Sequence, residues 1–325
     1  MTTPFVVTSV SFVSALTTAI LPVLAIAGVG FVLGRFREVS VEPLSTVTIF
    51  ILTPALVFSS LVNTELGGEA ILTLVVGVVA FTVAMVGLSE AAARAVGETG
   101  PLRSGLVLTS TFSNAGNYGI PLSAFAFGAV GRSTAVLYIA VQAVLMYTIG
   151  VYVASRGTSG HWADAIIEVF KLPLVYAVLL AGLVRALGVV PPAEGTVMQT
   201  VTLTGDSAIP VMLVMLGIQL ANTNYGSTIT RVWVPTALKM AVAPVAALAI
   251  ALGIGFEDPV VGRVFVLECA MPAAITPLML TIEYGGEGTR IDAAEYVSTT
   301  IMVTTVVSVP VLAVLIGVLQ SGAVL

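Results

Sequence analysis

Charged residues are scarce in this chain, and their scarcity excludes a soluble globule. Asp, Glu, Lys and Arg together make up 9% of the 325 residues, whereas 58% are hydrophobic and the mean hydropathy is +1.09. Soluble domains carry about 25% charged residues, which cover their surface. Because lipid offers no hydrogen bonds to a backbone, the sequence predicts an all-α polytopic membrane protein.

Cysteine and histidine are nearly absent as well, with only Cys269 and His161. A disulfide framework is therefore impossible, and a zinc-type cluster of Cys and His ligands is disfavoured. A nucleophile–base pair is equally hard to build, and Asp206 lacks a second aspartate in another apolar segment, so an intramembrane enzyme is disfavoured. The net charge of −5 and the few lysines do not indicate a nucleic-acid partner.

Long apolar segments are abundant, and a helix needs about 20 apolar residues to cross the hydrocarbon core. Glycine, proline or charged residues separate nearly all of these segments. We predict ten spans, at 14–34, 44–62, 70–93, 102–129, 133–155, 171–188, 197–221, 233–254, 260–284 and 294–319.

The basic residues predict the orientation, since Lys and Arg are retained on the cytoplasmic side. Eight lie in odd-numbered loops and three in even-numbered loops: Arg35, Arg37, Arg94, Arg103, Arg156, Lys171, Arg231 and Arg290 against Arg132, Arg185 and Arg263. We expect Lys239 near the cytoplasmic end of 233–254, where its stem can extend to the interface. Both termini are therefore expected outside the cell membrane.

The two halves of the chain resemble each other. The stretch "LPVLAIAGVGFVLGR" at 21–35 is similar to "LPLVYAVLLAGLVRALG" at 172–188, and "GIPL" at 119–122 is similar to "ITPL" at 275–278. Apolar sequences also resemble one another by composition alone, but here the landmarks keep their order. We interpret 1–155 and 171–325 as two five-span repeats, joined by a short cytoplasmic linker at 156–170. An odd number of spans makes the second repeat inverted.

Helix-breaking residues interrupt the fourth and ninth spans near their centres. In 102–129 the break is marked by Gly116, Gly119 and Pro121, and in 260–284 by Pro272 and Pro277. Proline removes a donor, and glycine permits backbone that other residues avoid. We expect each span to form two half-helices with an unwound link between them.

The two breaks are expected to meet at the middle of the membrane. Pro121 and Pro277 suit the first position of the outgoing half-helices, so free N–H groups would lie near Leu122-Ser123 and Leu278-Met279. Helix N-termini attract anions, while the carbonyls that end the incoming half-helices suit a cation. The alternative is two proline-kinked structural helices, but matching kinks in two repeats favour a transport site.

Motifs at these breaks and in the fifth span resemble those of the auxin efflux carrier family, which is related to the sodium–bile acid symporters. They are "NAGNYGIPL" at 114–122, "MPAAITPLMLTIEYG" at 271–285 and "VQAVLMYT" at 141–148. The resemblance implies ten spans as a five-plus-five inverted repeat, with crossed, broken fourth and ninth helices. It also implies a scaffold domain, a transport domain that moves as an elevator, a homodimer and a small organic anion as substrate.

The resemblance also implies which residues form the substrate site. Substrate and crossover positions would be Asn114, Asn117, Gly119, Pro121, Gln142, Tyr147, Pro272 and Pro277. The large cytoplasmic loop of many plant members is missing, so auxin itself is not indicated.

Glu268 is an ionisable residue placed directly before the ninth-span break. A charge at such depth usually faces a cavity and a partner. With Ser113 and Asn114 it could supply oxygen ligands for sodium, the type of ligand that hard cations prefer. Glu268 could instead carry a proton, or be a structural acid. No other cofactor is expected.

The sequence thus predicts a secondary transporter for a small carboxylate, coupled to sodium or protons. Alternatives are an uncoupled organic-anion carrier, a channel or an intramembrane enzyme.

Two further pairs of polar residues lie in or near the spans. Ser59 and Ser60 could reach the pocket or serve helix packing, and Glu90 and Arg94 are expected to form an i, i+4 pair.

Overall fold

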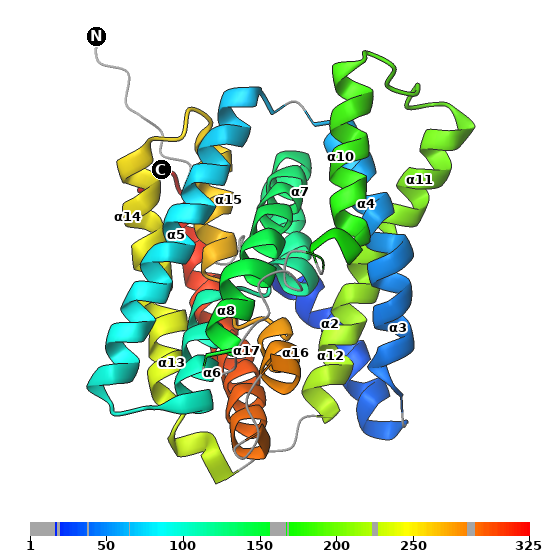
Figure 1. Ribbon diagram of the computed structural model, residues 1–325. Coiled ribbons are helices and arrows are strands. Elements are labelled where there is room, and N and C mark those ends of the chain that lie inside the picture. Colours follow the sequence, from blue (N-terminus) through cyan, green and yellow to red (C-terminus); the bar gives the residue numbers. More distant parts are fainter. Residues whose placement is uncertain are drawn as a thin grey trace.

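The computed structural model describes residues 17, 20–37, 39–64, 66–156, 167, 169–222, 227–284 and 290–325, and this part of the chain is helical (Figure 1). The linker prediction at 156–170 falls almost wholly outside these residues, as does His161. The elements are α2 (Leu21–Phe36), α3 (Val41–Val47), η2 (Thr48–Leu52), α4 (Thr53–Val62), α5 (Gly68–Ala95), α6 (Gly100–Thr111), η3 (Ala115–Gly119), α7 (Ile120–Leu145), η4 (Met146–Gly150), α8 (Val151–Ala154), α10 (Pro173–Ala186), α11 (Thr196–Asp206), α12 (Ala208–Asn222), η5 (Ser227–Thr230), α13 (Trp233–Ala237), η6 (Leu238–Val242), α14 (Ala243–Ile254), α15 (Pro259–Cys269), α16 (Thr276–Tyr284) and α17 (Arg290–Gln320).

Six helical runs of the described chain are long and apolar enough to cross a membrane. They are Val41–Val62, Gly68–Ala95, Ala115–Ala154, Thr196–Asn222, Trp233–Ile254 and Ala293–Gln320, and two shorter apolar helices are Leu21–Phe36 and Pro173–Ala186. The predicted all-helical membrane class is therefore confirmed.

The chain reverses direction inside the run Ala115–Ala154, at Gly128. Gly128 has φ 63° and ψ −143°, which breaks the helix geometry of α7. A Cβ at Gly131 would lie 2.2 Å from the Ser123 carbonyl oxygen, so the segments before and after the turn lie against each other. The predicted junction at 130–132 is thus a sharp glycine turn inside α7, and Arg132 belongs to a helix and not to a loop.

The helices form two groups. One group contains α2, α3, α4, α10, α11 and α12, which lie together at the right of Figure 1. The other contains α5 to α8 and α13 to α17, and its helix α7 lies on the side that faces the first group. Within the first group α2 and α12 pack at backbone contact, because a Cβ at Gly217 would lie 1.9 Å from the Ala27 carbonyl oxygen.

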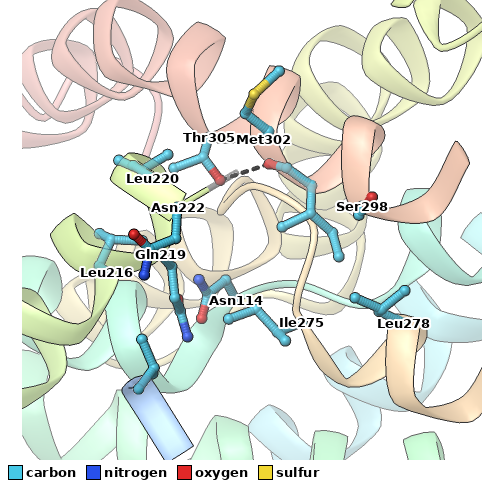
Figure 2. A pocket seen from close by; sticks show the side chains of 12 residues that line it. Asn114, Leu216, Gln219, Leu220, Asn222, Ile275, Leu278, Ser298, Met302 and Thr305 are labelled. Atoms are coloured by element: carbon cyan, nitrogen blue, oxygen red, sulfur yellow. Dashed lines mark hydrogen bonds between the residues drawn. The ribbon is translucent and has the colours of Figure 1, made fainter. Parts of the chain in front are cut away.

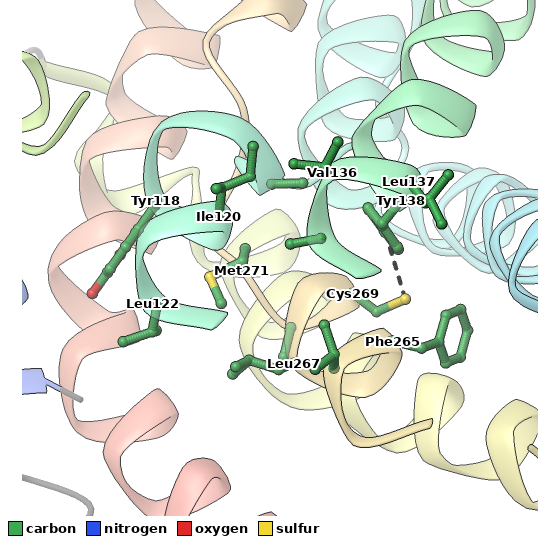
Figure 3. Close-up of a cluster of buried hydrophobic side chains, with 14 of the residues drawn as sticks. Tyr118, Ile120, Leu122, Val136, Leu137, Tyr138, Phe265, Leu267, Cys269 and Met271 are labelled. Carbon is green, nitrogen blue, oxygen red and sulfur yellow. Dashed lines mark hydrogen bonds between the residues drawn. The ribbon is translucent and has the colours of Figure 1, made fainter. Parts of the chain in front are cut away.

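A hydrophobic core that extends into both groups includes the junction of α7 with α15. Tyr118, Tyr138, Phe265 and Met271 belong to this cluster, and all four side chains are buried (Figure 3). Phe265 also packs edge-on against Phe81 of α5, with 6.5 Å between ring centroids. This packing fixes the two interrupted segments described next.

Candidate functional site

The two interrupted segments cross each other and are joined by backbone hydrogen bonds. Ser113 and Ala273 form an isolated antiparallel bridge. The Asn114 N–H donates to the Pro272 carbonyl over 2.8 Å, and the Ala274 N–H donates to the Phe112 carbonyl over 3.0 Å. The expected breaks in 102–129 and 260–284 are therefore present, and they meet. We call residues 112–114 and 272–274 the crossover.

Four helix ends point at the crossover. The incoming helices α6 and α15 end at Thr111 and Cys269. The outgoing helices begin at Ala115, with the π-turn η3 that continues into α7, and at Thr276, with α16. Since η3 precedes Pro121, the free N–H groups belong to the turn that starts at Ala115, and the prediction of free groups near Leu122-Ser123 is wrong.

Two cavities flank the crossover and lie between the two helix groups. One has a volume of about 220 Å³, and its lining includes the first turns of both outgoing helices, at Gly116, Asn117 and Thr276. The other, of about 230 Å³, is lined by residues of α12, α16 and α17 (Figure 2). Asn114 and Ile275 line both cavities, so the crossover forms the partition between them.

Several of the proposed substrate residues lie on the 220 Å³ cavity. Asn114, Asn117, Gln142 and Tyr147 are part of its lining. Gln142 also supports the crossover, because its amide donates to the Ser113 carbonyl over 2.8 Å and its carbonyl accepts from the Ser113 N–H over 3.1 Å.

The remaining proposed residues do not line the 220 Å³ cavity, and they belong to the crossover or lie next to it. Pro272 supplies the carbonyl that binds Asn114, and Pro277 is the second residue of α16. Gly119 and Pro121 are buried, and a Cβ at Gly119 would lie 2.0 Å from Oε2 of Glu268.

Glu268 is fully buried on the side of the crossover that faces α7. Its Oε1 accepts a hydrogen bond from the Ser123 hydroxyl over 2.6 Å, and its Oε2 has no hydrogen-bond partner among the described residues. In that part of the chain, no hydrogen bond joins the carboxylate to Ser113 or Asn114, the other two expected cation ligands. The Ser113 hydroxyl donates instead to the Cys269 carbonyl over 3.1 Å.

Lys239 is a site residue that the sequence did not reveal. The side chain is 0% exposed, so the prediction that it extends to the cytoplasmic interface is wrong. Its Nζ lies 2.7 Å from the Ser113 hydroxyl, inside the crossover. Hydropathy gives the same signal for a lysine at the end of a span and for a buried lysine with hydrogen-bond partners from other helices, so the sequence could not distinguish the two.

A third cavity, of about 480 Å³, lies further along the boundary between the helix groups. Ser59, Ser60 and Arg132 are among its lining residues. Arg132 donates to Asp206 over 2.5 Å and to the Ser60 hydroxyl over 2.9 Å. Asp206 therefore has an ion-pair partner on the other helix group, and Ser59 and Ser60 face this cavity, away from the crossover.

Basic residues gather at one end of the molecule around Glu90. The expected pair with Arg94 is present at 3.8 Å, and Arg103 and Arg156 also contact the Glu90 carboxylate. These contacts tie the C-terminal end of α5 to the start of α6 and the end of α8.

Comparison with known proteins agrees with this architecture. A family model described as "Membrane transport protein" matches residues 15–163 and 163–316. An "Uncharacterized transporter" of Methanothermobacter thermautotrophicus (strain Delta H) is 24% identical over 298 residues, which cover 90% of this chain and 96% of that protein. Both matches point to transport and not to catalysis. The chain belongs to the membrane transport protein family, the auxin efflux carrier family that its crossover motifs resemble.

Proposed function

We propose that the chain is a secondary carrier that moves a small organic anion, of the carboxylate class, across the cell membrane. One observation carries the proposal: the first turns of two outgoing helices line a single cavity at the crossover. Helix N-termini carry positive partial charge and offer free N–H groups to an anion. No charged side chain lines this cavity in the described chain, so these amides are its principal anion-binding groups.

The size of the cavity favours a small substrate. Its volume of about 220 Å³ is below the ~300–1,000 Å³ typical of sites for drug-sized ligands. Substrate would enter from one cavity and leave through the other as the α5–α8 and α13–α17 group shifts against the α2–α4 and α10–α12 group. This movement is the elevator mechanism that the family resemblance implies.

The finer architecture belongs to the same proposal. Ten spans in a five-plus-five inverted repeat would place the two breaks in equivalent positions of the two halves. Arg94, Arg103 and Arg156 share one end of the molecule through Glu90, which supports a cytoplasmic location for that end and both termini outside. We further propose a homodimer as the assembled form.

Coupling to a proton gradient would involve Glu268. Its unpartnered Oε2 is a buried acceptor that a proton would satisfy. The isosteric variant Glu268→Gln should keep the Ser123 contact and the fold while uptake loses its dependence on a proton gradient. Uptake by this variant that still follows a proton gradient would remove Glu268 from the coupling step.

The transport proposal is tested with purified protein in liposomes. Unlabelled carboxylate inside the vesicles should drive counterflow of labelled carboxylate, and the neutral amide of the same compound should not. Counterflow distinguishes a carrier from a channel, because a channel has no obligatory exchange of bound substrate. Absence of counterflow for a panel of small mono- and dicarboxylates would contradict the proposal.

A further inference from the structure

Lys239 lies at the point where both incoming half-helices end. It belongs to η6 (Leu238–Val242), and its Nζ is 3.4 Å from the carbonyl oxygen of Thr111 and 3.3 Å from that of Cys269. These are the last residues of α6 and α15. With the Ser113 hydroxyl at 2.7 Å, three oxygens surround the nitrogen.

The three oxygens match a charged ammonium group. An ammonium has three N–H donors, whereas a neutral amine has two. The Ser113 hydroxyl donates its own proton to the Cys269 carbonyl, so its lone pairs are free to accept from Lys239. Carbonyls at helix C-termini carry negative partial charge, and the ring of Phe81 lies 5.7 Å from Nζ, both of which stabilise a cation.

No carboxylate of the described chain forms an ion pair with Lys239. Its positive charge is therefore balanced by helix ends and a hydroxyl, not by an acid. Carbonyls at the ends of interrupted helices are the ligands with which carriers of this construction bind a coupling sodium ion. A lysine nitrogen placed among them excludes sodium sterically and by charge.

We propose that Lys239 is a tethered cation that takes the place of a sodium ion at the crossover, so that the carrier binds no sodium there. Ser113, one of its partners, also lines the 220 Å³ cavity. The Lys239 ammonium is thus hydrogen-bonded to a residue that lines the proposed anion site. Its positive charge offsets the negative charge of a bound carboxylate. This last step rests on the proposed function, whereas the exclusion of sodium does not.

The test compares sodium with potassium at equal ionic strength, using the melting temperature of the purified protein. Wild-type protein should melt at the same temperature in both salts. Lys239→Ala opens the oxygen cluster to an ion and water, so sodium at about ten times its Kd should raise the melting temperature by about 2–4 °C relative to potassium. Lys239→Met fills the same space with an apolar side chain and should show no difference between the salts.

A merely structural lysine would lower the stability of both variants without any preference between the salts. Sodium-specific stabilisation of the wild type, or a folded Lys239→Ala variant that melts equally in both salts, would overturn the proposal. If Lys239→Ala does not fold, the wild-type comparison still decides, since a sodium-filled crossover must respond to sodium. In liposomes, uptake by the wild type should be equal in sodium and potassium, and uptake by Lys239→Ala should fall at least tenfold without sodium.

Discussion

Gly119 provides the space that the Glu268 carboxylate occupies. The motif glycines Gly116 and Gly119 suggested an unusual backbone, but neither has a positive φ, and Gly119 has φ −66°. A Cβ at 119 would overlap the carboxylate, at 2.0 Å from Oε2 and 2.7 Å from Cδ. The glycine is therefore required for close packing between η3 and α15, and not for backbone freedom.

Gly119→Ala should destabilise the protein by about 1–3 kcal/mol, because a buried methyl group must displace the carboxylate or the helix. Chemical denaturation or melting in detergent measures this loss. Gly116→Ala is the matched control, since the nearest atom to its Cβ is the flexible end of Ile139 at 2.7 Å. The double variant Gly119→Ala/Glu268→Ala should recover part of the loss, and strictly additive effects would contradict the steric account.

The interruption of two helices was predictable from the sequence, and its consequences were not all predictable. Prolines and glycines near the centres of 102–129 and 260–284 indicated two breaks, and the structure has both. The start of the outgoing helix was misplaced by several residues, because a π-turn at Ala115–Gly119 extends α7 in front of Pro121. Composition indicates that a helix is broken, but the exact start depends on tertiary hydrogen bonds such as the one from the Asn114 N–H to the Pro272 carbonyl, at 2.8 Å.

Partners that lie far apart in the sequence were beyond sequence reasoning. Lys239 and Arg132 looked like interface residues, since basic residues in apolar segments usually mark span ends. Their acceptors are 126 residues away in Ser113 and 74 residues away in Asp206. Only the fold brings these groups together.

Gln142 binds the backbone of Ser113 in the crossover through two hydrogen bonds. Replacing Gln142 should therefore weaken the crossover as a whole. Gln142→Leu would leave the buried N–H and C=O of Ser113 without these partners, at about 1–3 kcal/mol for each group. We expect a lower melting temperature and a loss of carboxylate uptake. Gln142→Glu is the graded control, because a carboxylate still accepts from the Ser113 N–H but does not donate to its carbonyl. Equal behaviour of the two variants would mean that the paired geometry is unimportant.

At the scale of the whole molecule, a polar contact joins the two helix groups at the third cavity. Arg132 lies on α7 of the α5–α8 and α13–α17 group, whereas Asp206 and Ser60 lie on α11 and α4 of the other group. A rigid shift of one group against the other has to break these contacts. An exposed ion pair contributes only about 0–1 kcal/mol, and the Asp206 side chain is 51% exposed, so the contact can open repeatedly during transport.

A crosslink across this boundary should therefore stop transport, whereas a crosslink inside one group should not. Cysteines at Ser60 and Arg132, joined by a short bifunctional thiol reagent, would tie the groups together and abolish counterflow. Cysteines at Gly34 and Ala221 are the matched control, since a Cβ at Gly34 would lie 3.1 Å from that of Ala221, within the α2–α12 contact. The native Cys269 is 0% exposed and should not react.

Cleavage of the Ser60–Arg132 crosslink should restore counterflow, because only the relative movement of the two helix groups was blocked. Full counterflow in the crosslinked protein would rule out a rigid shift along this boundary.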